Sequence, residues 1–247
     1  MDATHTIVPE YDAIPAGFEF RDYVKTSQTH NSFINVIDKS SDIALTARRM
    51  SSDEKAYAEA KGITLFETPI ALDAFIFILN PKNSVSSLST RQIQDIYTGK
   101  ITNWKEVGGS DAAINPYVQN VNSGSQELME SLVMKELQIA TFPEELVSSM
   151  MMAFSSVRFN NNGICYTVYY YKESMVRDDT GVKHIAVDGV YPDKNTIANK
   201  SYPYTTEVYA VIRSDLDKNS MGYKLYELLQ TKAGKNVIEE SGYILQN

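Results

Sequence analysis

Cysteine, histidine and long apolar runs are scarce in this chain of 247 residues, which contains one Cys and three His. A single Cys cannot form an internal disulfide and excludes a zinc or redox site built on a CxxC pair. The longest apolar stretch, residues 69–79, is interrupted by Asp73 and is far shorter than the roughly 20 residues of a membrane-spanning helix. The GxSxG, GxxxxGK[ST], GxGxxG and HExxH signatures are absent, so hydrolase, P-loop, dinucleotide-binding and zinc-peptidase functions have no support.

Positive charge is also in deficit, because 23 Lys and Arg stand against 31 Asp and Glu and give a formal net charge of −8. This balance argues against a nucleic-acid partner, since binding to phosphate backbones depends on clustered basic residues. Met1 is followed directly by Asp2 with no apolar segment after it, so we expect a membrane connection only through a removed signal segment or lipid anchor. The composition indicates an acidic globular protein of one or two domains.

Strand and helix patterns alternate along the chain, which predicts an α/β architecture. Capping-box spacings at Ser51/Glu54 and Ser89/Gln92 predict helices over residues 51–61 and 89–97. Further helices are predicted over 126–137, 144–154 and 221–240, and strands over 42–47, 63–65, 70–79, 115–119, 164–171 and 206–212. The methionines at 150–152 are interpreted as core packing rather than as a binding surface.

Three clusters of small polar residues stand where the chain is expected to enter a helix. A helix start presents unpaired backbone N–H groups and a partial positive charge, so hydroxyl groups and a glycine there can hold an anion. For any one cluster, plain helix capping is the favoured alternative. The clusters contain Thr4, His5 and Thr6, then Thr26, Ser27, Thr29 and Ser32, and finally Ser123, Gly124 and Ser125.

Two further candidates are Arg48, which follows the predicted strand 42–47, and Cys165. An arginine at the carboxyl end of a strand can bind an oxyanion through two parallel hydrogen bonds. The alternative is a loop arginine that pairs with Asp53 or Glu54. Cys165 lies in an apolar predicted strand, where a buried, inert thiol is favoured over a nucleophile activated by a histidine.

A long segment then carries a family resemblance. Residues 80–111, NPKNSVSSLSTRQIQDIYTGKITNWKEVGGSD, are similar to the NPxNPVxxLTxxQLxxIFTGKITNWKEVGG stretch of the phosphate ABC-transporter substrate-binding protein family. Other similar segments follow the family's order: THTIVPE weakly, and DIALTARRMSSDE, VNSGSQELMESLV, NNNGICYTVYYY and VKHIAVDGVYPDKNTIANKSYPYTTEVYAVI more clearly. The match covers most of the chain from residue 42 to residue 212.

The resemblance implies a type II periplasmic-binding-protein fold with two α/β lobes, crossing strands between them and the ligand in a cleft. Lobe 1 is expected over residues 1–79 plus 203–247, and lobe 2 over 80–202. The implied function is non-enzymatic capture of inorganic phosphate, or a similar oxyanion, by closure around it, followed by delivery to an ABC permease. No cofactor or metal is expected, and the protein is expected to be a periplasmic or cell-surface monomer.

The resemblance also assigns site residues by position. Besides the three clusters, Thr46 and Arg48 occupy the place after the strand, and Gln119 stands where many members have an arginine. The loop at Ser123 reads SGS rather than SGT, which keeps the hydroxyl, and at Arg48 some members have an aspartate. Because fold does not fix function, a sensing or interaction protein with an altered anion site is the alternative.

Overall fold

The computed structural model describes residues 4–7, 24–120, 123–142, 146–176 and 181–245. Internal contacts divide the chain into unit 1, residues 1–72 with 206–246, and unit 2, residues 73–205 with 247. The chain passes from one unit to the other within β4 (Leu65–Leu79) and returns at β12 (Thr205–Arg213). The expected lobe limits, after residues 79 and 202, remain a prediction. Among the described residues, no helix is long and apolar enough to cross a membrane.

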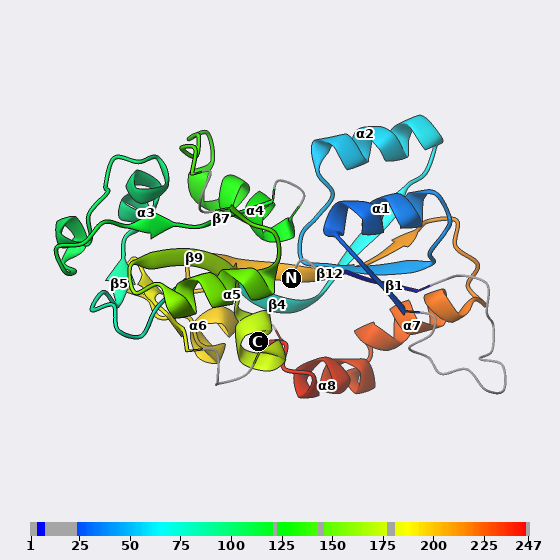
Figure 1. The fold of residues 1–247 in the computed structure, drawn as a ribbon. Coiled ribbons are helices and arrows are strands. Elements are labelled where there is room, and N and C mark those ends of the chain that lie inside the picture. The colour runs from blue at the N-terminus through cyan, green and yellow to red at the C-terminus, as the bar shows by residue number, and fades with distance from the viewer. Residues whose placement is uncertain (1–3, 8–23, 121–122, 143–145, 177–180, 246–247) are drawn as a thin grey trace. The chain divides into compact units, whose positions relative to one another are not determined.

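Unit 1 is built on a five-strand path in the order β2-β1-β3-β12-β4 (Figure 1). Besides β4 and β12 it contains β1 (Thr4–Ile7), β2 (Val24–Ser27) and β3 (Ile43–Thr46). β1 is antiparallel to both β2 and β3, and β12 is antiparallel to β3. The strands expected at 42–47 and 206–212 are therefore confirmed as β3 and β12.

The prediction of two separate strands at 63–65 and 70–79 is wrong, because one continuous strand, β4, runs from Leu65 to Leu79. Residues 66–70 of β4 are exposed or half-buried, so no apolar run marks them in the sequence. Pro69 lies in this less buried stretch. Proline is tolerated where its missing N–H is not needed by a neighbouring strand.

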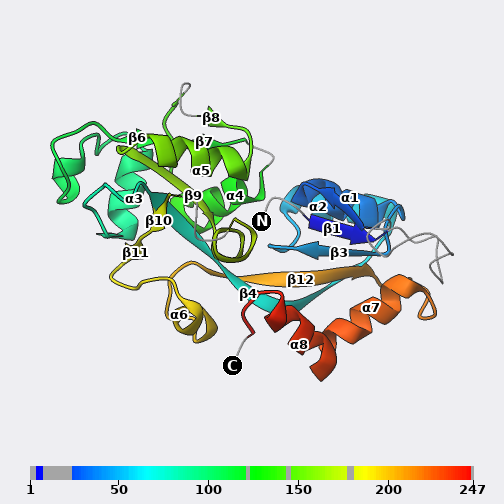
Figure 2. The same cartoon turned by 60° about the horizontal axis from the view of Figure 1, so that its bottom comes forward.

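Helices cover both faces of the unit 1 sheet. α1 (Thr29–Ile37) and α2 (Ser52–Lys61) lie on one side of β3 and β12, and α7 (Met221–Gln230) and α8 (Lys232–Glu240) lie on the other (Figure 2). Ala44 and Val211 join the core cluster of α1 and α2, whereas Ile43 joins the cluster that contains residues of α7. Successive strand residues point to opposite faces, so β3 supplies both cores.

The single helix expected over 221–240 is also wrong, since Thr231 separates α7 from α8 and caps α8. A Cβ at Gly234 would lie 1.9 Å from the carbonyl oxygen of Leu228, so the two helices meet backbone to backbone. Both helices carry apolar residues at helical spacing, and that periodicity does not reveal a break.

A buried arginine joins β12 to the end of α1. Arg213 Nη1 donates to the carbonyl oxygens of Val36 at 3.0 Å and Ser41 at 2.8 Å. Its Nη2 lies 3.6 Å from Oδ1 of Asp42, and both side chains are buried. α7 passes so close that a Cβ at Gly222 would lie 2.3 Å from Asp42 Cβ. The ion pair is thus enclosed by the strand and by helices on both sides.

Unit 2 is built on the second part of β4. β9 (Gly163–Val168) is antiparallel to β4 and parallel to β6 (Asn115–Pro116), and β10 (Lys183–His184) is antiparallel to β4. The other elements are β5 (Ser87–Leu88), β7 (Val118–Gln119), β8 (Leu146–Val147), β11 (Ala186–Val187), α3 (Thr90–Tyr97), α4 (Gly124–Leu128), α5 (Met150–Phe159), α6 (Lys194–Ala198), a 3-10 turn (Trp104–Val107) and π-helical segments (Met129–Met134, Tyr171–Met175). An aromatic cluster of Phe75, Phe77, Tyr97 and Tyr166 forms the centre of its core.

Both predicted capping boxes are present, at Ser51/Glu54 and Ser89/Gln92. Three boundaries in unit 2 are corrected. The helix expected over 126–137 starts at Gly124 and becomes π-helical at Met129, and the strand expected over 164–171 ends at Val168. The segment expected as one strand over 115–119 forms the two short strands β6 and β7. Propensity does not distinguish a π-helical from an α-helical turn.

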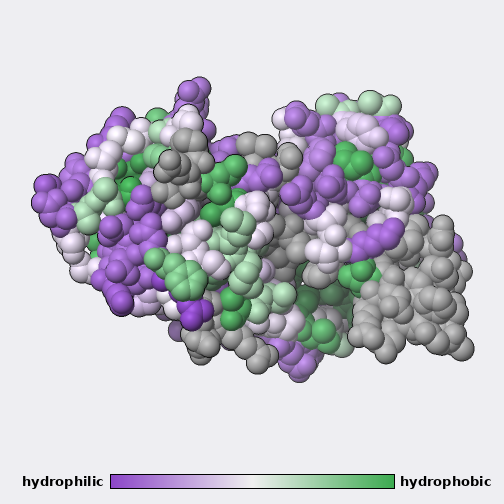
Figure 3. Space-filling view, viewed as in Figure 1, coloured by the Kyte–Doolittle hydropathy of each residue, from purple (hydrophilic) through white to green (hydrophobic). Residues whose placement is uncertain are grey.

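The helix expected over 144–154 begins only at Met150, because β8 precedes it. Met150 is buried, but Met151 is 52% and Met152 is 44% exposed, so the assignment of all three to the core is wrong. Consecutive side chains on a helix point about 100° apart, and three in a row cannot all face one core. In Figure 3, hydrophobic patches lie among hydrophilic residues over α5.

Asp73 is a buried carboxyl group near the start of unit 2, and we expect it to make stability pH-dependent. Oδ1 accepts hydrogen bonds from the backbone N–H groups of Ala74 and Tyr170, but Oδ2 has no partner in the described part of the chain. Burial raises the pKa of Asp73 to about 6, against the weaker opposing effect of the backbone hydrogen bonds. The folded state therefore favours the protonated form, and its stability falls as the pH rises from about 4 through 6.

From this group alone, the free energy of unfolding is expected to fall by about 2 kcal/mol between pH 4 and pH 7. Urea unfolding of the wild type and Asp73→Asn at both pH values measures it. Because the amide does not ionise, the stability of the variant relative to the wild type should increase as the pH rises. An equal difference between the two proteins at pH 4 and pH 7 would contradict this prediction.

Candidate functional site

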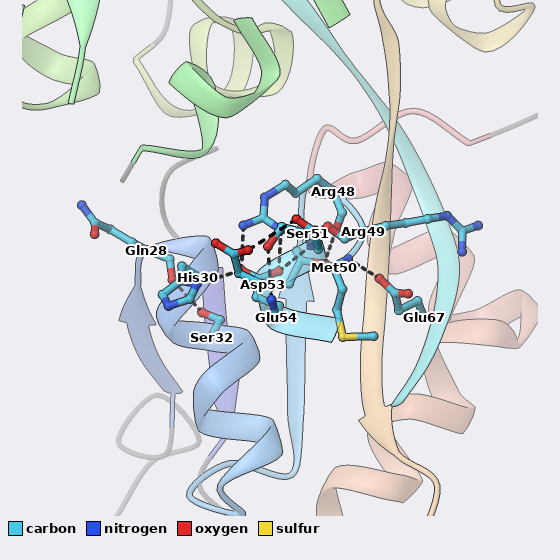
Figure 4. Close-up of polar contacts among 12 residues, drawn as sticks. Gln28, His30, Ser32, Arg48, Arg49, Met50, Ser51, Asp53, Glu54 and Glu67 are labelled. Carbon is cyan, nitrogen blue, oxygen red and sulfur yellow. Dashed lines mark hydrogen bonds and ion pairs between the residues drawn. The ribbon is translucent and has the colours of Figure 1, made fainter. Parts of the chain in front are cut away.

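Arg48 lies directly beyond β3, and its guanidinium is fixed by a buried carboxylate of α2 (Figure 4). Nη1 donates to Oε2 of Glu54 at 2.8 Å, and Nη2 donates to Oε1 at 2.9 Å. Only 11% of the Arg48 side chain and none of the Glu54 side chain is exposed. The guanidinium also lies 5.4 Å from the ring centre of Phe33. Arg48 is therefore a fixed cation rather than a solvated loop side chain.

Glu54 contacts the start of α1 as well as Arg48. His30 Nδ1 lies 3.0 Å from Oε1, and the backbone N–H of Ser51 donates to Oε2 at 2.8 Å. Burial by itself opposes ionisation of the carboxyl group, but the hydrogen bonds and charge of Arg48 outweigh it and lower the pKa of Glu54. The pair is ionised at neutral pH.

The α1 start contains the second predicted cluster. Gln28 caps this helix, and the described chain shows no side-chain hydrogen bond from Gln28 to the helix. Thr29 and Ser32 are buried, and Ser32 Oγ lies 2.5 Å from Ser27 Oγ. Thr26 and Ser27 form the end of β2. This geometry combines a helix start with hydroxyl groups, as the sequence predicts.

Thr46 shapes the turn that carries Arg48. Its Oγ1 donates to the carbonyl oxygen of Arg48 at 2.8 Å, and the threonine is buried. Arg49, the next residue, is exposed, and its guanidinium lies 4.7 Å from the ring centre of Tyr209. Of the two adjacent arginines, Arg48 is thus the one whose guanidinium is held in place by the buried carboxylate of Glu54.

The first predicted cluster is not at a helix start. Thr4, His5 and Thr6 lie within β1, where the backbone pairs with β2 on one side and β3 on the other. Threonine favours extended backbone, and the strand pairing uses the N–H and C=O groups that a helix start would present. The following residues, 8–23, lie outside the described part of the chain.

In unit 2, Gln119 holds the third cluster in place. Ser123 Oγ donates to Gln119 Oε1 at 2.8 Å, while Gln119 Nε2 donates to the carbonyl oxygen of Tyr166 at 2.9 Å. Ser123 caps α4 by accepting from the backbone N–H of Gln126. Ser123, Gly124 and Ser125 are all buried. In the place of the family arginine, Gln119 thus orients the serine loop through neutral hydrogen bonds.

Several contacts of the site go beyond what the sequence predicted. The pairing of Arg48 with Glu54 was an open alternative, and the structure shows it in a buried form. The contact of His30 with Glu54, and the contacts of Tyr166 and Gln126 with Gln119, follow only from the fold. The capping box over 51–54 was the one local signal, since it brings the Glu54 carboxylate back toward the residues that precede α2. Cys165 is fully buried in β9, and its Sγ lies 3.8 Å from the carbonyl oxygen of Tyr166.

The fold, together with these potential anion-binding groups, is that of a solute-binding protein. Comparisons with known proteins support the same class. The profile of the PBP superfamily domain matches residues 17–231. The phosphate-binding protein PstS of Staphylococcus epidermidis is 30% identical over 229 residues, which cover 87% of this chain and 67% of that protein. PstS of Borreliella burgdorferi is 26% identical over 220 residues, which cover 87% of this chain and 75% of that protein.

Solved structures give the same result. A phosphate ABC-transporter substrate-binding protein of Clostridium perfringens with bound phosphate is 27% identical, with a TM-score of 0.73 over 88% of this chain and 84% of that one. An ABC-type phosphate transport receptor of Vibrio cholerae is 26% identical, with a TM-score of 0.70 over 88% and 85% of the two chains. The chain belongs to the phosphate ABC-transporter substrate-binding protein family, and the expected α/β periplasmic-binding-protein fold is confirmed.

Proposed function

We propose that this protein captures inorganic phosphate outside the cytoplasm, without chemistry on it, and delivers it as a monomer to an ABC permease. The observation that carries the proposal is the largely enclosed Arg48, held by the buried Glu54 beside the start of α1, in a chain whose relatives are phosphate-binding proteins. The comparisons favour this function over that of a sensing or interaction protein with an altered site.

In unit 1, the proposed donors to phosphate are the guanidinium of Arg48, the hydroxyl groups of Thr29 and Ser32, and the first backbone N–H groups of α1. A buried oxyanion needs nearly all of its lone pairs satisfied, because desolvation otherwise costs several kcal/mol. A fixed arginine and a helix start meet this need without reorganisation at the moment of binding.

In unit 2, the proposed donors are the Ser123 and Ser125 hydroxyl groups and the backbone of Gly124. Gln119 is proposed to act on the anion through Ser123 rather than by direct charge, because its amide is hydrogen-bonded to Ser123 and Tyr166. The net charge of −8 opposes phosphate at long range, but salt screens charges beyond roughly 8–10 Å.

Calorimetric titration tests the proposal with phosphate, arsenate and sulfate as separate ligands. We expect saturable heat with phosphate, loss of affinity in Ser123→Ala, and no change in Cys165→Ser, since Cys165 is buried in β9. Absence of heat with all three anions would contradict the proposed function. Loss of binding in Cys165→Ser alone would contradict the proposed site.

A further inference from the structure

Three segments of unit 1 converge on the carboxylate of Glu54. Oε1 lies within hydrogen-bond distance of Arg48 Nη2, at 2.9 Å, and of His30 Nδ1, at 3.0 Å. Oε2 accepts from Arg48 Nη1 and from the backbone N–H of Ser51, both at 2.8 Å. A carboxylate has about four acceptor positions, so these contacts use all of them.

Helix capping accounts for only one of these contacts. In a capping box, the Glu side chain needs a single oxygen to accept from the cap residue's N–H, and here Oε2 accepts from Ser51. The other oxygen, Oε1, joins Arg48 to His30, which belongs to the first turn of α1. The carboxylate therefore links the turn after β3 to the α1 start, as Figure 4 shows.

The burial of the pair matters for its role. Removing two charges from water is costly, and a buried ion pair is a poor source of net stability compared with apolar packing. A two-point pair does, however, fix the plane and position of a guanidinium, because each nitrogen is bound to a separate oxygen. With Glu54 wholly buried, Arg48 has one defined position.

We propose that Glu54 is a positioning residue for phosphate: it holds Arg48 at the end of β3 and ties it through His30 to the α1 start. This inference rests on the proposed function, since its effect is on phosphate affinity. Glu54 itself does not contact the anion; its negative charge would repel it. Its contribution is the pre-organisation of the groups that do.

Glu54→Gln is the principal test, measured by calorimetric titration with phosphate. The amide keeps the size of the side chain but has one acceptor oxygen instead of two, and its NH2 group faces an N–H donor of Arg48 or Ser51. We expect phosphate affinity to fall about ten- to hundredfold, the range that loss of a supporting hydrogen-bond partner causes at metal sites. Unchanged affinity in a folded Glu54→Gln protein would overturn the proposal.

Ser51→Ala is the matched control, because it removes the hydroxyl of the same capping box and leaves the Glu54 carboxylate with Arg48. It should lower thermal stability and leave phosphate affinity within about twofold. If Ser51→Ala weakens phosphate as much as Glu54→Gln does, the role of Glu54 is only that of a cap, and the proposal fails.

Glu54→Asp is the alternative test variant if Glu54→Gln does not fold. It keeps the charge but is one methylene shorter, so it cannot reach Arg48, His30 and Ser51 together, and we expect weaker phosphate binding. Wild-type affinity in the aspartate variant would overturn the proposal. These outcomes are distinct from failure of the proposed function, in which the wild-type protein itself gives no heat with phosphate.

Discussion

Arg48→Ala is expected to weaken phosphate binding at least about a hundredfold, which corresponds to about 2.7 kcal/mol of binding free energy. The variant removes the proposed cation of unit 1 and the hydrogen bonds of a charged group, which are the strongest kind available to an oxyanion. It also leaves the buried Glu54 carboxylate without the guanidinium that pairs with it, so stability should fall by about 3–5 kcal/mol. Calorimetric titration and urea unfolding measure the two effects separately.

Arg48→Lys and Arg49→Ala complete this experiment. Lysine keeps the charge but cannot form two parallel hydrogen bonds, so we expect a folded protein with about tenfold weaker binding. Arg49 is exposed over Tyr209, and its replacement should change affinity little. If Arg49→Ala lost phosphate binding and Arg48→Ala kept it, the arginine assignment would be wrong.

Arg213→Ala is expected to destabilise the protein by about 3–5 kcal/mol, because it removes one partner of a buried ion pair. Arg213 donates to the carbonyl oxygens of Val36 and Ser41 and lies beside the buried Asp42. In the variant, the two carbonyl oxygens and the Asp42 carboxylate lose the guanidinium that contacts them. β12 then loses its link to the end of α1. The midpoint of urea unfolding measures the loss.

Lys39→Ala is the control for this prediction. Lys39 pairs with Asp215, which also accepts from Arg213 Nε. Both partners of the lysine pair are about half exposed, and such pairs contribute at most about 1 kcal/mol. Equal destabilisation by Arg213→Ala and Lys39→Ala would show that burial of the Arg213 pair has no special effect.

Local signals in the sequence predicted those elements whose ends are marked by side chains. The capping boxes at Ser51 and Ser89 placed the starts of α2 and α3, and the strand at 42–47 placed the buried β3. The wrongly predicted boundaries are those that are set by tertiary packing rather than by local sequence. The break at Thr231 depends on the close approach of Gly234 to the end of α7, and no residue near it has the signature of a helix stop.

The site shows the same division. Arg48 could be chosen from its place after a strand, and Glu54 was one of the two adjacent carboxylates, with Asp53, that the sequence offered as its partner. Its contact with His30 joins residues 24 apart in sequence, and spacing alone cannot predict it. The cluster at Thr4 looked like a helix entrance because hydroxyl-bearing residues suit both caps and strands. The backbone pairing of this segment with β2 and β3 shows that it is a strand and not a helix start.

The place of β12 between β3 and β4 has a consequence for biosynthesis. Both neighbours of β12 are made early, whereas β12 itself begins at Thr205. All of residues 73–205, which form unit 2, leave the ribosome before the sheet of unit 1 can close. Until then, β3 and the first part of β4 each have an unpaired edge, which is a template for pairing with other chains. The nascent protein therefore exposes aggregation-prone strand edges at β3 and β4 until β12 emerges and pairs with both.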